Sequence, residues 1–425
     1  MEYMQSVQYI HSLLKFGIKP GLERIESLLE SLNNPQDDFK CFHVAGTNGK
    51  GSTCAMLHSV CVEAGYKTGL FISPFVIDFC ERIQINKQFI SHSDLAEAVA
   101  IVKAASDKLS DDLKPTEFEF ITAVAFKYFS IKKCEIAVIE TGLGGRLDST
   151  NVIKSPLATV LTKIDMDHMD ILGDTVEKIA YEKCGIIKTG CPVLFSPTQE
   201  KNVQTVIKTI ANQKAAPLFE SEYEGIYNIK STIDGTTFSS NDLEIFLPLL
   251  GEHQIDNAML ALAALNVSKL EVSKQDIIFG LQKVSFPARL EIISKNPTVI
   301  LDGAHNLNGS LALKAAIENF GLHDITAIIG MMKDKDIDGV LNNILPFCQN
   351  VITVTVTSNS RSIEAEHLLK KAKKYCENCC AASSYFEALL KPKLLANKNP
   401  IVIFGSLYLA GDIREIAQKE FNSTT

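Results

Sequence analysis

A glycine-rich turn that carries a lysine, between a short apolar strand and an apolar helix, constrains this chain most. The turn runs from Val44 to Thr53 and reads VAGTNGKGST. Strand Phe42–Val44 is predicted before it, and a helix from Ser52 to Gly65 after it. Glycines permit the φ angles that turn backbone N–H groups toward phosphate oxygens, and Lys50 would reach the β- and γ-phosphates of a nucleotide. We interpret the turn as a phosphate-binding loop; the alternative is a glycine turn without function.

The loop departs from the general P-loop pattern at two places. Two residues separate Gly46 from Gly49 where four are usual, and Gly51 follows the lysine where a Ser or Thr is usual. Ser52 or Thr53 must therefore supply any hydroxyl. The predicted nucleotide contacts in the loop are Asn48, Gly49, Lys50, Gly51 and Ser52.

Strand-like and helix-like segments alternate along most of the chain. Strands are predicted at 68–72, 136–140 and 158–164, with a helix at 117–129, and this alternation indicates a mainly parallel sheet. From Pro217 to Leu250 the segments become short and alternate in polarity around Asp234-Gly235, which predicts a small antiparallel insert.

The alternation restarts after Arg289, with strands predicted at 299–301, 325–329, 351–356 and 401–404. A chain of 425 residues exceeds the roughly 250–300 that one core supports. The fold class is therefore α/β, with an N-terminal P-loop domain (1–294) and a smaller Rossmann-like C-terminal domain (295–425).

Composition limits the class of partner and the compartment. A net charge of −8 without a dense Lys/Arg block argues against nucleic acid. No apolar run approaches the roughly 18 residues of a membrane helix, and the first residues lack a basic stretch followed by an apolar one. We expect a cytoplasmic monomer without a membrane partner.

Most of the eleven cysteines stand singly in apolar stretches, which indicates buried thiols in a reducing compartment. Cys376, Cys379 and Cys380 form the one cluster. The cluster is either half of a zinc site or a helix end with small residues. Because no second Cys or His pair completes a metal site, we favour the helix.

Ordered motifs along nearly the whole chain resemble the folylpolyglutamate synthase and dihydrofolate synthase branch of the Mur ligase family. In the first half they are GTNGKGS (46–52), SPF (73–75), ERI (81–83), ETGLGGRLDSTN (140–151), DH (167–168) and EKCGI (182–186). The second half carries GEHQ (251–254), Asn257, Arg289, DGAHN (302–306), DKD (334–336) and FGS (404–406).

This resemblance implies an amide ligase that uses ATP and Mg²⁺. The γ-phosphate of ATP would be transferred to a carboxylate of a folate or of dihydropteroate, and the amine of glutamate would attack the acyl phosphate. Lys50 and magnesium would neutralise and position the phosphates.

The family also implies roles for residues outside the loop. Ser73 and Glu140 would hold one magnesium ion, while Glu140 and His168 would hold a second. Lys183, as a carbamate, would supply an oxygen beside the second ion. The alternatives are a structural role for Glu140, an ordinary surface or core position for His168, and solvated helix surface for the stretch Tyr181-Glu182-Lys183.

The remaining residues implied by the resemblance bind substrates. Asn257, Arg289 and Asp302 would contact ATP, and His305 and Ser406 would hold glutamate. The catalytic residues would be Lys50, His168, Lys183 and His305. The pteridine-side residues would be Thr116, Glu117, Phe118, Glu119, Leu147, Asp148 and Ser149. An aromatic ring at Phe118 would stack on the pterin or belong to the core.

Two other functions are compatible with a phosphate-binding loop. A cell-wall ligase of the same family carries a further domain ahead of the loop, and too few residues precede Gly46 here to form one. A regulatory P-loop ATPase would not need the amine site of the second domain. Whether the protein has one or two folate activities stays open; the segments at 116–119 and 147–149 favour two.

Overall fold

The structure is a computed structural model that describes residues 2–17, 19–196, 198–220, 225–240, 242–394 and 399–422. The chain forms two compact units. The first consists of Met1–Tyr227, Ser239–Ile245 and Gln254–Val284, and the second of Asn228–Phe238, Phe246–His253 and Ser285–Thr425. Each unit is described by itself.

Within the described residues, the first unit is built on eight strands in the order β4-β3-β2-β5-β1-β6-β7-β8. β3 pairs antiparallel with β2 and β4, and the other pairs are parallel. The strands are β1 (Lys40–Ala45), β2 (Thr68–Phe71), β3 (Ile83–Ile85), β4 (Gln88–Phe89), β5 (Ile136–Glu140), β6 (Ala158–Leu161), β7 (Val193–Phe195) and β8 (Leu218–Glu220). The predicted mainly parallel sheet is confirmed.

The central strands of this sheet are apolar and buried, as strands covered on both faces must be. β5 is buried at all five positions, and β1 at all but Lys40. The helices are α1 (Tyr3–Ser12), α2 (Glu23–Ser31), α3 (Lys50–Glu63), α4 (His92–Ser106), α5 (Glu117–Ile131), α6 (Met169–Leu172), α7 (Val176–Cys184), α8 (Lys201–Gln213), α9 (His253–Ser268) and α10 (Lys274–Gln282).

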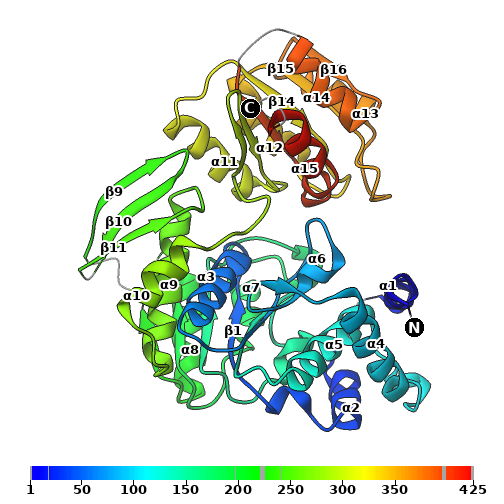
Figure 1. Cartoon of the computed structure of the whole chain (residues 1–425), viewed down its shortest axis with the longest axis vertical. Coiled ribbons are helices and arrows are strands. Elements are labelled where there is room, and N and C mark those ends of the chain that lie inside the picture. The colour runs from blue at the N-terminus through cyan, green and yellow to red at the C-terminus, as the bar shows by residue number, and fades with distance from the viewer. Residues whose placement is uncertain are drawn as a thin grey trace. The chain divides into compact units, whose positions relative to one another are not determined.

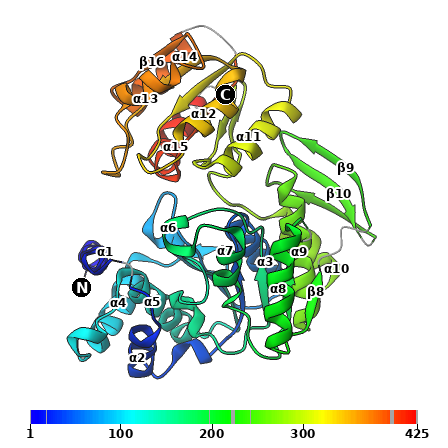
Figure 2. The same cartoon turned by 180° about the vertical axis from the view of Figure 1, so that it is seen from behind.

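Two hydrophobic clusters hold these helices on the sheet. α2, α4 and α5 lie together (Figures 1 and 2) and share a core that includes Leu28, Val99 and Phe126. α7 and α8 lie side by side (Figure 2) and pack on β6 and β7 through Ile179 and Ile207. The carboxyl ends of the central parallel strands therefore project from a rigid support.

The second unit contains six strands in the order β12-β13-β17-β14-β15-β16, as far as its described residues show. Only β12 runs antiparallel to its neighbour. The strands are β12 (Glu291–Lys295), β13 (Thr298–Leu301), β14 (Ile325–Ile329), β15 (Cys348–Thr353), β16 (Cys379–Ala381) and β17 (Ile401–Phe404). The helices are α11 (Leu307–Asn319), α12 (Ile337–Ile344), α13 (Ala365–Ala372), α14 (Tyr385–Leu394) and α15 (Leu407–Asn422). The predicted second α/β fold is confirmed.

The antiparallel insert is present but narrower than predicted. It consists of β9 (Ile226–Thr232), β10 (Gly235–Ser240) and β11 (Leu243–Leu247), in the order β11-β10-β9. The segment after Pro217 does not belong to it, because β8 pairs parallel with β7 and extends the main sheet. A strand of three residues is too short for its polarity pattern to show which sheet it joins.

The prediction of a helix or helix end at the cysteine cluster holds for Cys376, whose N–H donates to the carbonyl of Ala372 at the end of α13 at 3.1 Å, but it was wrong for Cys379 and Cys380. Cys379 and Cys380 lie in β16, the edge strand beside β15, where Cys380 pairs with Ile352. Tertiary pairing with β15 overrides a local sequence that has no clear strand pattern. The predicted burial of Cys41, Cys54, Cys61, Cys134 and Cys184 is confirmed.

α3 begins at Lys50, two residues earlier than predicted, because Gly49 at φ 88° forms its N-cap. In the part of the chain that the structure describes, no helix is long and apolar enough to cross a membrane.

Candidate active site

The predicted phosphate loop joins the end of β1 to the first turn of α3. Gly49 is left-handed, and a Cβ there would overlap the side-chain oxygen of Asn257 on α9. Only glycine fits this position. The free N–H groups of the first turn of a helix favour anions.

The loop is also fixed from the side by the segment that follows β6. The N–H groups of Thr47 and Asn48 donate to the carbonyl of Lys163 at 2.8 and 3.0 Å. The Thr47 hydroxyl donates to the carbonyl of Asp165 and accepts from its N–H, both at 3.0 Å. Sequence reasoning missed Thr47 as a positioning residue, although its place in the GTNGKGS motif was a signal.

Two lysines converge on one carbonyl of this loop. Lys50 Nζ lies 3.1 Å from the carbonyl oxygen of Gly46, and Lys183 Nζ lies 2.8 Å from the same oxygen. Lys50 is half-buried, whereas Lys183 is 4% exposed. The fold thus gathers two amines from segments 133 residues apart at one point of the phosphate loop.

The environment of Lys183 disfavours its charged form. Burial, followed by repulsion from Lys50, lowers the pKa of Lys183 from 10.5 to about 7, and attraction to Asp167 and Asp148 opposes this only in part. A substantial fraction of the side chain is therefore an uncharged amine near neutral pH. An uncharged amine is a nucleophile, which an ordinary surface lysine at this pH is not.

Lys183 is buried because a glycine segment lies directly on α7. A Cβ at Gly145 would overlap the main-chain oxygens of Glu182 and Lys183, and the N–H of Arg146 donates to the carbonyl of Glu182 at 2.7 Å. On the opposite face of the helix, Tyr181 is 55% exposed. The sequence pattern indicated solvated surface for this whole stretch, and that interpretation is wrong for Lys183.

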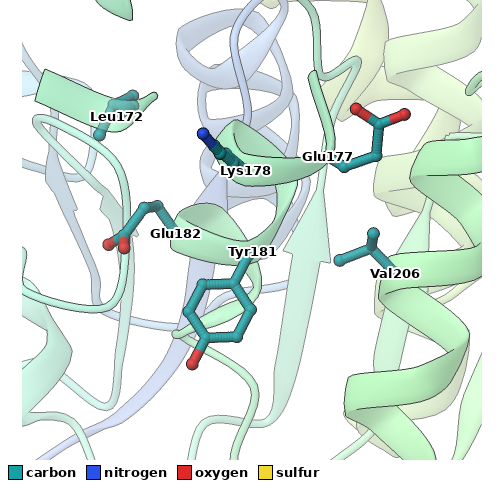
Figure 3. A pocket seen from close by; sticks show the side chains of 6 residues that line it. All are labelled: Leu172, Glu177, Lys178, Tyr181, Glu182 and Val206. Atoms are coloured by element: carbon teal, nitrogen blue, oxygen red, sulfur yellow. The ribbon is translucent and has the colours of Figure 1, made fainter. Parts of the chain in front are cut away.

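The exposed face of α7 borders a hollow of about 400 Å³ that is separate from these amines. Figure 3 shows side chains around it from α6, α7 and α8. They are Leu172, Glu177, Lys178, Tyr181, Glu182 and Val206. None of the predicted site residues lines this hollow.

Three residues predicted as magnesium ligands lie at the carboxyl end of β5 or in the segments that follow β2 and β6. Glu140 ends β5 and is 4% exposed, and its carboxylate accepts the N–H of Ser73 at 3.0 Å. His168 is the left-handed N-cap of α6, with a side chain that is 48% exposed, and its Nε2 lies 3.7 Å from Asp167 Oδ2. The structure thus brings Ser73 and Glu140 together, and it places His168 on a separate loop at the same sheet edge.

The pteridine-side segment opens α5. Thr116 is its N-cap and Glu119 completes a capping box, in which the carboxylate of Glu119 accepts the N–H of Thr116 at 2.7 Å. Phe118 lies 5.9 Å from Phe71 between ring centroids and against the α-carbon of Gly142. Glu117 is partly exposed and pairs with His11 at 3.1 Å. The structure leaves both interpretations of Phe118 available.

Glu119 has a structural partner that sequence reasoning missed. Arg24 contacts both oxygens of its carboxylate, at 2.9 and 3.2 Å, and the two side chains are 11% and 6% exposed. No motif in the sequence includes Arg24, so no signal distinguished it. A role of Glu119 in substrate binding stays a prediction.

We expect Glu119→Ala to lower the free energy of unfolding by about 3–5 kcal/mol, because it leaves the buried guanidinium of Arg24 without its partner. Glu117→Ala is the matched control, since its ion pair with His11 is partly exposed and should contribute less than about 1 kcal/mol. Urea unfolding of the two variants measures the difference. Equal stabilities would contradict the structural role of the Arg24–Glu119 pair.

The second pteridine-side segment folds back on itself. Asp148 is 5% exposed, and its carboxylate accepts the N–H groups of Leu143 at 2.8 Å and Thr150 at 3.0 Å. Burial raises the pKa of Asp148, although these hydrogen bonds oppose the rise. Ser149 is also buried, whereas Leu147 is 37% exposed. Asp148 therefore shapes the loop that covers Lys183.

The predicted residues of the second unit lie around the end of β13. The carboxylate of Asp302 accepts the N–H groups of Leu290 at 2.7 Å and Ala304 at 2.8 Å. Burial raises the pKa of Asp302, and Arg289 opposes the rise. His305 Nδ1 lies 3.0 Å from the carbonyl oxygen of Gly303. Arg289, Asp302 and His305 thus share one loop cluster.

Ser406 follows β17, the strand next to β13, and is 2% exposed; its hydroxyl accepts the N–H of Tyr408 at 3.0 Å. In the first unit, the Asn257 amide donates to Gln254 at 3.0 Å. Ser406 thus lies in a loop after a strand, and Asn257 lies in the second turn of α9.

Comparison with known proteins identifies this arrangement. Residues 44–265 match the Mur ligase middle domain, and residues 282–416 match the dihydrofolate synthetase C-terminal domain. The dihydrofolate synthase/folylpolyglutamate synthase of Bacillus subtilis is 38% identical over 428 residues, covering 97% of this chain and 98% of that protein. The chain belongs to the folylpolyglutamate synthase and dihydrofolate synthase family of Mur ligases.

Other members of this family agree. The folylpolyglutamate synthase of Lacticaseibacillus casei is 35% identical, covering 98% of both chains. The structure of Mycobacterium tuberculosis folylpolyglutamate synthase complexed with ADP is 29% identical, with a TM-score of 0.88 over 98% of this chain and 99% of that one. The predicted family and ligase class are confirmed, and the regulatory ATPase is not supported.

Proposed function

We propose that this protein joins the amine of glutamate to a carboxylate of a folate at the expense of ATP. The γ-phosphate would pass to the carboxylate, and the amine would then displace phosphate from the acyl phosphate. The convergence of Lys50 and Lys183 at the carbonyl of Gly46, in a loop that opens α3, carries this proposal. Phosphoryl transfer needs positive charge and positioning, and the loop offers both.

The residues of the first unit fit Mg²⁺ bound with ATP. Glu140 supplies a carboxylate beside Ser73, and oxygen is the ligand that Mg²⁺ prefers. Thr53, in the first turn of α3, has a buried hydroxyl without a hydrogen-bond partner among the described residues. A magnesium ion held there would supply positive charge that neutralises the phosphates. Ser73, Glu140 and His168 are the proposed protein ligands.

We also propose that Lys183 is carbamylated. Its neutral amine would attack carbon dioxide, forming an N–C bond and releasing one proton to solvent. The product is a carboxylate-like anion, which replaces repulsion from Lys50 by attraction. A pKa of about 7 and a buried position beside the loop support this step.

The other assignments complete the proposal. Asn48, Gly49, Gly51, Ser52, Asn257, Arg289 and Asp302 would contact ATP, and His305 and Ser406 would hold glutamate. Residues 116–119 and 147–149 would hold the pteridine side. The boundary between residues 294 and 295, the cytoplasmic location and the monomeric state stay predictions.

ATP turnover by the purified protein tests the proposal. With Mg²⁺, a reduced folate and glutamate, we expect ADP and an elongated folate in equal amounts. Omitting either the folate or glutamate should lower ADP formation by at least about 100-fold, because the acyl phosphate needs both an acceptor carboxylate and an attacking amine. ADP formation that is independent of both substrates would instead favour the regulatory ATPase.

We further expect dihydropteroate to serve as an acceptor. Both reactions would pass through the same kind of acyl phosphate, so the phosphate loop does not distinguish them. Support comes from Thr116–Glu119 and Leu147–Ser149, which resemble segments of members with both activities, and from the two activities that the Bacillus subtilis relative is named for. The measurement is ATP-dependent dihydrofolate formation from dihydropteroate and glutamate. If no dihydrofolate forms while reduced folates are elongated normally, the protein has only the polyglutamate activity.

A further inference from the structure

Asp78, Cys80 and His92 bring a carboxylate, a thiol and an imidazole together outside the residues assigned above. Their ligand atoms all lie within 4.8 Å of one another. Asp78 and Cys80 belong to the turn around the short 3-10 helix Phe79–Arg82, and His92 is the first residue of α4. Cys80 is 3% exposed, whereas His92 opens to solvent. We propose that these three side chains form a zinc site.

The turn that carries two of the three donors is held rigid. The carboxylate of Glu81, 5% exposed, accepts the N–H groups of Val76, Ile77 and Asp78 at 2.8, 3.0 and 3.0 Å. Asp78 Oδ1 accepts the N–H of Cys80 at 2.7 Å. The carboxylate and the thiol are therefore oriented before any ion binds, which lowers the cost of assembling a site.

Tyr3 on α1 supports the third donor. Its ring stacks on the imidazole of His92, with centroids 3.7 Å apart and planes inclined by 9°. The Tyr3 hydroxyl also lies close enough to Cys80 and Asp78 for these groups, after burial, to raise its pKa. A metal-bound histidine needs a fixed ring orientation, and Tyr3 supplies it. Tyr3 thus packs on His92 and interacts electrostatically with the other two proposed ligands, from a different helix.

The types of the three donor atoms favour Zn²⁺ over other divalent ions. One sulfur, one nitrogen and one oxygen suit Zn²⁺, whereas Mg²⁺ and Ca²⁺ take oxygen ligands. A thiolate and a carboxylate together neutralise a divalent ion. Ligand atoms around tetrahedral zinc are about 3.5 Å apart, so small side-chain rotations would close the present cluster. The exposed side of His92 leaves the fourth position to water or to the Tyr3 hydroxyl.

Cobalt(II) titration tests the site, because a thiolate bound to cobalt adds a strong near-ultraviolet absorption band. The parent protein for the test carries Cys376→Ser, Cys379→Ser and Cys380→Ser, which removes the other clustered thiols. We expect one equivalent of cobalt to bind with this band, and zinc to displace it. No stoichiometric binding below about 10 μM cobalt would overturn the proposal.

Variants assign the donors. Cys80→Ser should abolish the band, and Asp78→Asn and His92→Asn should each weaken binding at least about 10-fold. Cys191→Ser, a partly exposed thiol elsewhere in the first unit, is the control and should leave the titration unchanged. A band that survives in Cys80→Ser would refute the site. If Cys80→Ser does not fold, unchanged affinity in the exposed variant His92→Asn refutes it equally.

Discussion

Lys50→Ala should reduce glutamate incorporation by about 10³-fold or more while the protein stays folded. The side chain is half-buried in the phosphate loop, and its ammonium is held by two main-chain oxygens, those of Gly46 and Thr47, at 3.1 and 3.4 Å. It therefore contributes little to the core. In phosphoryl transfer, a fixed cation stabilises the charge that develops on the transferred group, and removing one costs several powers of ten.

The measurement is the initial rate of ATP-dependent folate elongation at saturating glutamate, together with the thermal unfolding midpoint. Lys154→Ala is the matched control, because this side chain is 72% exposed and its ion pair among the described residues is with the exposed Asp37. Both variants should unfold near the wild-type temperature. A Lys50→Ala enzyme that keeps more than about a tenth of the wild-type rate would remove the phosphate-loop assignment.

Lys183→Ala should be nearly inactive, with a loss of about 10²-fold or more, because the carbamate oxygen and the positioning of the loop are both removed. Short-chain carboxylates such as acetate should restore part of the rate by entering the space left by the side chain. Lys188→Ala is the control on the same segment: that amine donates to the carbonyl of Asn151 and not to the phosphate loop. Isotope-labelled bicarbonate should give a carbamate carbon signal in the wild type only. Absence of that signal, with normal activity, would disprove carbamylation.

The pH dependence of stability provides a separate check on Lys183. Because burial lowers its pKa from 10.5 to about 7, the unfolded state binds more protons than the folded state between these values. The free energy of unfolding of enzyme freed of carbon dioxide should therefore rise as the pH increases from 7 toward 9. Lys183→Met should show a weaker rise. If the free energy of unfolding rises equally with pH in the wild type and in Lys183→Met, burial does not lower the pKa of Lys183.

The sequence predicted the fold where local patterns and tertiary structure agree. The central strands β1 and β5 are continuous apolar runs, and a strand buried on both faces requires this. The loop before α3 was predicted because glycines, a lysine and an adjoining helix occur in one short segment. The three-residue strands β8 and β16 were misassigned, since their place depends on pairing with β7 and β15.

The same distinction between local sequence and tertiary structure applies to the residues of the candidate site. The sequence determined which chemical groups are present: the lysine of the loop, the strand-end Glu140 and the motif that contains Lys183. Only the tertiary structure decided that the Lys183 amine lies at the carbonyl of Gly46, that its burial lowers its pKa, and that Arg24 occupies the carboxylate of Glu119. The physical reason is that composition and local periodicity follow from neighbours along the chain. Burial, charge repulsion and ion pairing depend instead on residues far away along the chain, 95 positions for Arg24 and Glu119 and 137 for Lys183 and Gly46, which come together only when the sheet and its helices close.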